Sequence, residues 1–143
     1  MATSPDTTNY YKGVPSPGLG SVGQYQSAGQ PYLTGSTVVG TSENTYAFPN
    51  VTKNVTVRNL DAATQTLYVH FASVSTSTDV ILNKHYITLD STRPEVTLNV
   101  RCPAVYISAP GGDAKAEVYA ELTSIVPPNG ISYNVVNYPG VSD

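Results

Sequence analysis

Charged residues are scarce in this chain, because Asp, Glu, Lys and Arg make up only 12% of its 143 residues. That share is about half of the roughly 25% usual for globular proteins. The seven basic and ten acidic residues leave a net charge of −3, so the basic surface that DNA or RNA binding requires is missing. Cys102 is the single cysteine, which excludes a disulfide within one chain.

Long hydrophobic runs are also missing. No apolar stretch approaches the roughly 20 residues of a membrane-spanning helix, so no membrane partner is expected. The first residues, MATSPDTTNYYKG, have neither the basic start nor the apolar core of a secretory signal. We therefore expect a soluble protein that is made in a cytoplasm.

The abundant residue types favour strands and turns. The chain has 18 Val, 17 Thr, 14 Ser and 11 Tyr, together with 11 Gly and 11 Pro. β-Branched residues and tyrosine are enriched in strands, while glycine and proline mark turns. Hydrophobic residues reach 40%, enough to bury a core, and this composition excludes a helix bundle.

Residues 1–42 differ in character from the rest of the chain. They hold seven of the 11 glycines and only two charges, Asp6 and Lys12. The stretch 13–23 follows neither the helical nor the strand period, so it cannot bury a face of its own. We predict an extended N-terminal arm that is ordered against a partner; the alternative is a passive tail. The expected anchors are its spaced apolar and aromatic side chains, Tyr10, Tyr11, Leu19, Val22, Tyr25, Tyr32 and Leu33.

Period-two alternation begins at Thr37 and covers most of the remaining chain. Apolar and polar residues alternate at 54–58, 67–71, 87–89, 96–101 and 105–108, and turn residues recur at intervals of about 8–12 residues. One apolar and one polar face are typical of antiparallel strands with a solvated side. We therefore predict that residues 43–143 form an all-β antiparallel β-sandwich of about eight strands, of the jelly-roll or immunoglobulin-like type.

The segment 114–122 fits two structures. It is rich in good helix formers. With period two, however, Lys115, Glu117, Tyr119 and Glu121 share one face and Ala116, Val118, Ala120 and Leu122 share the other. A helical stripe would leave Ala116 or Ala120 outside it, so we predict a strand.

The sequence offers no convergent set of catalytic or metal-binding residues. His70, His85 and Cys102 are scattered, whereas a metal site needs three or four ligands with defined spacing. We expect histidines that lie at the surface or in simple pairs, with His70 on a polar strand face. His85, Asp90 and Ser91 have the residue types of a triad but no nucleophile elbow. We predict no catalytic residues, no metal and no cofactor, and hence a protein that is not an enzyme.

Two other functional classes are left. A structural assembly protein fits the low charge, the uncharged arm and the missing catalytic groups. A carbohydrate-binding or receptor-binding module would use exposed Tyr68, Tyr106 or Tyr119 as stacking platforms, but such modules rely on Trp, which is absent. A small-molecule ligand is not expected.

The layout of the whole chain supports the first class. A domain of about 100 residues with sandwich patterning follows a Gly-, Pro- and Tyr-containing arm, and the runs 96–108 and 120–125 are similar to segments of small phage virion proteins. In this organisation the chain resembles the capsid decoration (cement) proteins of tailed bacteriophages. No residue motif defines that group, so no functional residue carries over.

The resemblance implies a non-enzymatic virion protein, made in the host cytoplasm and located on the capsid surface. Its partners would be the major capsid protein and copies of itself, as a dimer or trimer. It would stabilise the shell against the internal pressure of DNA. Head-fibre and tail components share the same layout.

Overall fold

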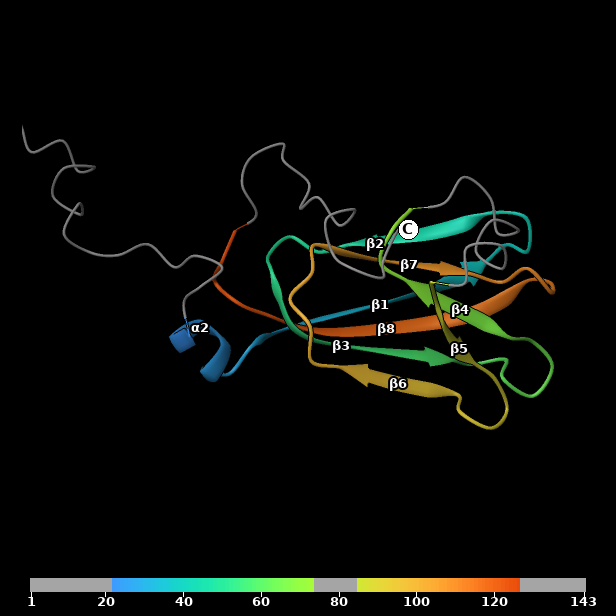
Figure 1. The fold of residues 1–143 in the computed structure, drawn as a ribbon, viewed down its shortest axis with the longest axis horizontal. Coiled ribbons are helices and arrows are strands. Elements are labelled where there is room, and N and C mark those ends of the chain that lie inside the picture. Colours follow the sequence, from blue (N-terminus) through green and yellow to red (C-terminus); the bar gives the residue numbers. More distant parts are fainter. Residues whose placement is uncertain (1–21, 74–84, 127–143) are drawn as a thin grey trace, which may run out of the picture.

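A computed structural model describes residues 22–73 and 85–126 of the chain. Within these residues a short helix, α2 (Val22–Gln26), precedes eight strands (Figure 1). The strands are β1 (Gln30–Val38), β2 (Glu43–Ala47), β3 (Thr52–Asn59), β4 (Leu67–His70), β5 (Ile87–Leu89), β6 (Glu95–Leu98), β7 (Ala104–Ser108) and β8 (Ala114–Leu122). The predicted all-β class is confirmed, and residues 114–122 form a strand, as their period-two pattern indicated.

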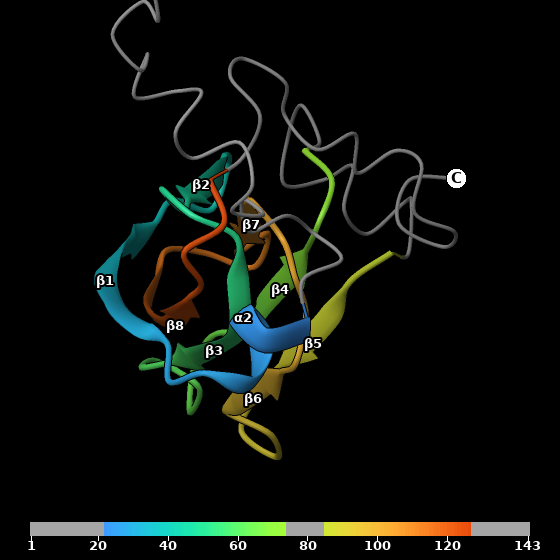
Figure 2. The same cartoon turned by 90° about the vertical axis from the view of Figure 1, so that its left-hand side faces the viewer.

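The strands form two four-stranded sheets, with the orders β1-β8-β3-β6 and β2-β7-β4-β5. Figure 2 views the two facing sheets nearly end-on. Four antiparallel pairs join the first half of the chain to the second: β1·β8, β2·β7, β3·β6 and β4·β5. The two halves thus form one long antiparallel ribbon, which is rolled up into the two sheets of the sandwich. This order is that of a jelly roll. The immunoglobulin-like alternative is wrong, because that fold pairs its first strand with its second.

The core lies between the sheets and follows the predicted alternation. On β8 the alternate residues from Ala114 to Leu122 are buried, while Lys115 and Tyr119 are exposed. Two valines of the neighbouring strand β3 and larger side chains of the facing sheet complete the core, and they are completely or almost completely buried: Val55, Val57, Leu67, Val69, Leu89, Val105 and Ile107. Each such side chain contributes about 1.5–3 kcal/mol through burial. The hydrophobic contact between the sheets therefore supplies most of the fold's stability.

Residues 30–38, which the sequence pattern assigned to the arm, are part of the sandwich. They form β1, which pairs with β8 along its whole length, from Gln30 opposite Leu122 to Val38 opposite Ala114. The boundary expected between residues 42 and 43 is therefore wrong, and the sandwich includes the chain from residue 30. The alternation of β1 is weak in the sequence because two of its inward-facing residues, Thr34 and Ser36, are polar. Thr34 is half-buried and Ser36 is exposed, so neither position needs an apolar side chain.

Hydrogen bonds and one turn glycine stabilise the connections between the sheets. Asn59, which is buried, donates through Nδ2 to the C=O of Gln65 (2.8 Å) and of Leu89 (3.0 Å), and its Oδ1 accepts from Asp61 N. In the turn between β7 and β8, Gly112 has a φ of 143°, which a side chain would strain. These positions set where the chain leaves one sheet for the other.

Candidate interaction surface

The residues predicted to anchor the arm lie in different parts of the chain. Tyr10, Tyr11 and Leu19 lie outside the described residues. Val22 and Tyr25 lie on α2, where Val22 is 65% exposed and the hydroxyl of Tyr25 is buried without a hydrogen-bond partner among the described residues. Helix α2 is fastened to the end of the sandwich, because Ser124 N donates to Gln24 Oε1 (3.2 Å) and Lys53 Nζ donates to Ser27 O (2.8 Å).

Tyr32 and Leu33 lie side by side on β1 and point in opposite directions. The ring of Tyr32 packs edge-on against Phe48, with 5.2 Å between ring centroids, and its hydroxyl donates to the C=O of Ala47. Leu33 is 68% exposed. Of these two residues, Tyr32 therefore contacts the chain's own core, and Leu33 exposes its apolar side chain.

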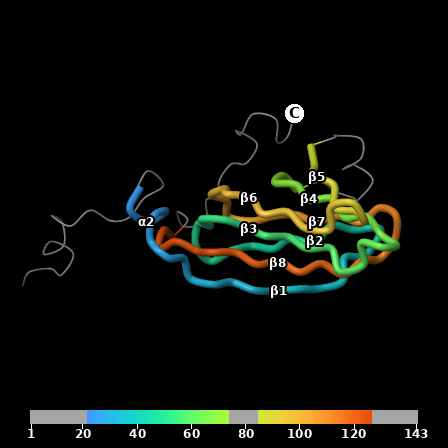
Figure 3. Tube along the Cα trace, turned by 90° about the horizontal axis from the view of Figure 1, so that it is seen from below, coloured from blue at the N-terminus to red at the C-terminus, as the bar shows by residue number. Residues whose placement is uncertain are grey.

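Strand β1 differs from the other three edge strands. The sheets end at β1, β6, β2 and β5. Strands β6, β2 and β5 have four, five and three residues, and the first two begin with a glutamate. Strand β1 has nine residues and no charge, and Figure 3 shows it at the margin of its sheet beside β8. Shortness and charge are common protections of a sheet edge against pairing. Strand β1 is neither short nor charged. Pro31, near its start, is its one residue of a type that hinders pairing.

The direction of the backbone groups of β1 follows from its neighbour β8. The N–H of Lys115 donates to Asp61 Oδ2 at 2.7 Å, and its C=O accepts from Leu60 N at 2.9 Å. Both groups therefore point toward the β3 side of β8 and away from β1. Thr37 is opposite Lys115 in the register, so its own N–H and C=O point to the free edge of the sheet.

Alternate residues of β1 accordingly face the free edge. The register with β8 is continuous, so Pro31, Leu33, Gly35 and Thr37 share this direction. The C=O of Thr37 accepts from Asn44 Nδ2 at 3.1 Å, and Pro31 has no N–H. At this edge, the described part of the chain supplies no hydrogen-bond partner for the N–H and C=O of Leu33 and Gly35. As far as residues 22–73 and 85–126 are concerned, these four groups are open to a partner strand.

A hollow lies on the outer face of the sheet beside this edge. It has a volume of about 440 Å³ and is lined by residues 33–37, Leu60 and residues 115–117. Gly35 leaves room because it has no side chain between its neighbours on that face, Leu33 and Thr37. Leu33 and Leu60 are both exposed, so the rim of the hollow is partly apolar.

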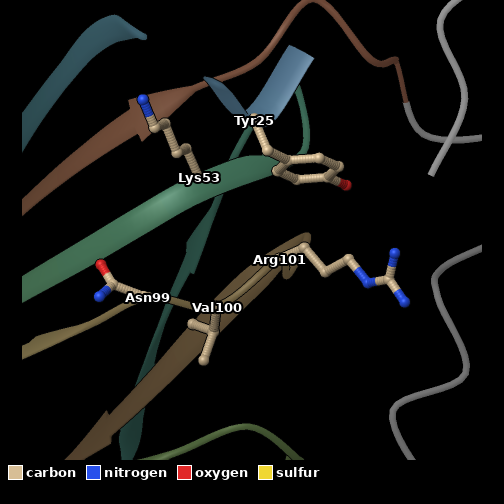
Figure 4. Close-up of a pocket in the computed structure, with 5 residues that line it drawn as sticks. All are labelled: Tyr25, Lys53, Asn99, Val100 and Arg101. Atoms are coloured by element: carbon tan, nitrogen blue, oxygen red, sulfur yellow. The ribbon is translucent and has the colours of Figure 1, made fainter. Parts of the chain in front are cut away.

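A second hollow lies at the end of the sandwich. It has a volume of about 610 Å³ and is lined by Tyr25, Lys53, Asn99, Val100 and Arg101. Figure 4 shows that the polar groups of Lys53, Asn99 and Arg101 point in different directions rather than toward one point. An aromatic ring beside cationic and amide side chains could contact a sugar, but the polar groups are not convergent.

A buried polar cluster lies on the outer face of the second sheet. His70 and Ser108 are 3% and 0% exposed. His70 Nδ1 lies 2.8 Å from the C=O of Ala72, which can only accept, so Nδ1 carries the proton. Nε2 then accepts from the hydroxyl of Ser108 at 2.9 Å. His70 lies on the polar face of β4, as predicted, but it is buried rather than solvated: it is hydrogen-bonded to Ala72 and Ser108, and its ring stacks on Tyr106.

This cluster has part of the geometry of a serine nucleophile and its base. Glu43, however, lies 4.0 Å from Nε2, whereas a triad places the carboxylate at Nδ1. Burial lowers the pKa of His70, against the opposing effects of the Ala72 hydrogen bond and of Glu43. Burial and then Glu43 raise the pKa of Tyr106, which stacks on His70. A serine with no exposed surface cannot meet a substrate in this conformation, so the cluster joins β2, β4 and β7.

The remaining candidate residues have structural contacts. Asp90 closes the turn after β5 by accepting from Thr92 and Arg93, and the Thr92 hydroxyl is the main cause of its lowered pKa. Cys102 is buried, and burial raises the pKa of its thiol. Across residues 22–73 and 85–126, no three His, Cys, Asp or Glu side chains are placed to hold a metal ion. No helix in these residues is long and apolar enough to cross a membrane.

Comparison with known proteins gives no match: no protein family, no curated protein and no solved structure is significantly similar to this chain.

Proposed function

We propose that this chain is a non-enzymatic structural protein of a bacteriophage virion, which binds and stabilises a capsid shell through protein–protein contacts. The observation that carries the proposal is the free edge of β1, which is long, uncharged and open at Leu33 and Gly35. Such an edge offers backbone hydrogen bonds to another polypeptide and no group that acts on a small substrate.

The fold is compatible with this function without deciding it. Eight-stranded jelly rolls occur in viral capsid proteins, and also in lectins and cupins, so the site has to carry the argument. The sandwich keeps its titratable cluster of His70 and Ser108 away from solvent. What it presents outward instead is polypeptide edge and apolar side chains such as Leu33 and Val22.

The segment before β1 supplies the second part of the proposal. We place the contact with the major capsid protein in residues 1–29, with Tyr10, Tyr11, Leu19 and Val22 as anchors. Isolated rings would fill pockets of the shell while backbone groups pair with its subunits. A few rings contribute roughly 1–3 kcal/mol each, which is less than the cost of ordering the segment. Many backbone hydrogen bonds are therefore needed, and a repeating protein lattice can provide them.

The test uses phage particles purified from the host that makes the chain. Quantitative mass spectrometry should find hundreds of copies in each particle if the protein decorates the shell, whereas a handful would indicate a fibre or tail position. Shells that lack the protein should bind the full chain and release a variant that begins at Val22. Particles without any copy would overturn the proposal.

A second candidate function is glycan or receptor binding, favoured by the hollow beside Tyr25 at the end of the sandwich. If it is correct, a glycan array should give saturable binding that Tyr25→Ala abolishes. Tyr119→Ala is the matched control, since this exposed tyrosine lies on a sheet face away from the hollow. Retained glycan binding in Tyr25→Ala would reject this hollow as the site.

A further inference from the structure

We propose that two copies of this chain pair through their β1 edges, antiparallel and about a two-fold axis at Thr34. The pairing would join the two β1-β8-β3-β6 sheets into one continuous sheet across the dimer. The inference rests on the proposed function, because it names a second copy of the chain as a polypeptide that the β1 edge binds. Its test uses purified protein without any shell, so its outcome is separate from particle binding.

The donors and acceptors of the edge match in this register. Leu33 of one copy lies opposite Gly35 of the other, and each exchanges two backbone hydrogen bonds with its partner. The same register places Thr37 opposite Pro31. Pro31 has no N–H to donate to the C=O of Thr37 across the axis. That C=O is nevertheless satisfied, because it already accepts from Asn44 of its own copy. The N–H of Thr37 meets the C=O of Pro31, so about six backbone bonds form and no edge group in the ladder is left unpaired.

The side chains on the outer face are also complementary. Leu33 of one copy lies next to Gly35 of the other, beside the hollow that the glycine leaves. The 68% exposed leucine would thus cover the neighbouring copy's gap and lose much of its contact with water. The two-fold axis repeats this contact, as an isologous interface requires.

Charge explains why the edge can meet a copy of itself. Identical charged residues would lie close together across a two-fold axis and repel each other. Strand β1 has no charged residue, whereas the β2 and β6 edges carry Glu43 and Glu95. Among the described edge strands, β1 is thus both long enough for a ladder and free of self-repulsion.

Disulfide cross-linking tests the register. Thr34 would face its own copy in a non-hydrogen-bonded pair, with about 4.5 Å between Cα atoms, which is within the range of a disulfide. Full-length Thr34→Cys should therefore form a covalent dimer under mild oxidation. Ser36→Cys is the matched control on the same strand and face, because residue 36 would lie opposite Tyr32. Cys102 is buried and should not compete. Absence of a Thr34→Cys dimer, or equal dimer in both variants, would overturn the register.

Sedimentation velocity tests the association itself. The full chain should change from monomer to dimer between about 1 and 500 µM, a range that covers a micromolar dissociation constant. Leu33→Lys should raise that dissociation constant at least tenfold, because it places two ammonium groups beside the axis. Val126→Lys changes an equally exposed apolar side chain outside the strands and should leave it unchanged. A full chain that stays monomeric throughout, or equal effects of the two variants, would overturn the proposal.

Discussion

The outer faces of the two sheets differ in what they do with polar side chains. On the β2-β7-β4-β5 sheet, His70 and Ser108 are buried and hydrogen-bonded to each other. On the β1-β8-β3-β6 sheet, the corresponding outward residues are exposed or half-buried, among them Thr56, Thr97, Glu117 and Tyr119. The part of the first face around His70 and Ser108 therefore belongs to the chain's own structure, whereas the polar side chains of the second face remain in contact with water. Each of the following predictions tests that contrast.

The largest effect should separate two N-terminal deletions. A variant that begins at Val22 keeps every described strand and should unfold cooperatively, with a free energy of unfolding within about 0.5 kcal/mol of the full chain. A variant that begins at Glu43 loses β1, so β8 lacks one of its two neighbouring strands. The deletion also removes the buried side chain of Val38 and exposes the core residues around it. It should show no cooperative transition in urea or heat. Normal unfolding of the shorter variant would mean that β1 belongs to the arm after all.

Removal of a buried polar side chain should be the next most costly change. His70→Ala leaves Ser108 and the C=O of Ala72 without their partner and opens a cavity, so unfolding should become easier by about 2–4 kcal/mol. Thr56→Ala removes an exposed hydrogen bond to Thr97 and should cost about 0.5 kcal/mol or less. Urea unfolding followed by circular dichroism measures both. Equal losses in the free energy of unfolding would contradict the contrast between the two sheet faces.

Acidification should weaken the β2-β7-β4-β5 sheet through the same histidine. Because its pKa is lowered in the folded protein, the unfolded chain binds more protons between that value and the usual value of about 6.5. The contribution of neutral His70 is thus complete above about pH 6.5 and is lost as the pH falls below it, by at most about 1.4 kcal/mol per pH unit. Urea unfolding across this range should show a slope that His70→Gln removes and His85→Gln retains.

The smallest effect belongs to the exposed sheet face. Arg58 Nε lies 3.3 Å from Glu95 Oε2, and both side chains are about half exposed. Water and salt weaken such pairs, so Arg58→Ala should change the free energy of unfolding by less than about 1 kcal/mol. Raising the salt concentration should reduce the difference further. A loss as large as that of His70→Ala would show that this face also has a structural role.

The sequence allowed the strands with strict alternation to be predicted, and also the strand 114–122, because each has one buried face. It did not reveal β1, since an edge strand with Gly35 outward and Ser36 inward shows little contrast in polarity. The open edge could not be read from the sequence either, because the direction of the Leu33 backbone depends on pairing with a strand far along the chain. The burial of His70 was missed for a similar reason: Ser108 and Tyr106, which contact its ring, lie on β7, far along the chain.

The rolled ribbon also fixes an order of events during synthesis. Among the strands in residues 22–73 and 85–126, β1 is made first, and β8, the strand that pairs with it, ends roughly 80 residues later. At about 5–20 residues per second, this delay is several seconds or more. Throughout that interval the uncharged strand lacks the β8 strand with which it pairs, and such long-range pairing is intrinsically slow. On a polysome, where neighbouring nascent chains expose the same strand, the edge proposed to pair two folded copies would also be the one most exposed to premature association.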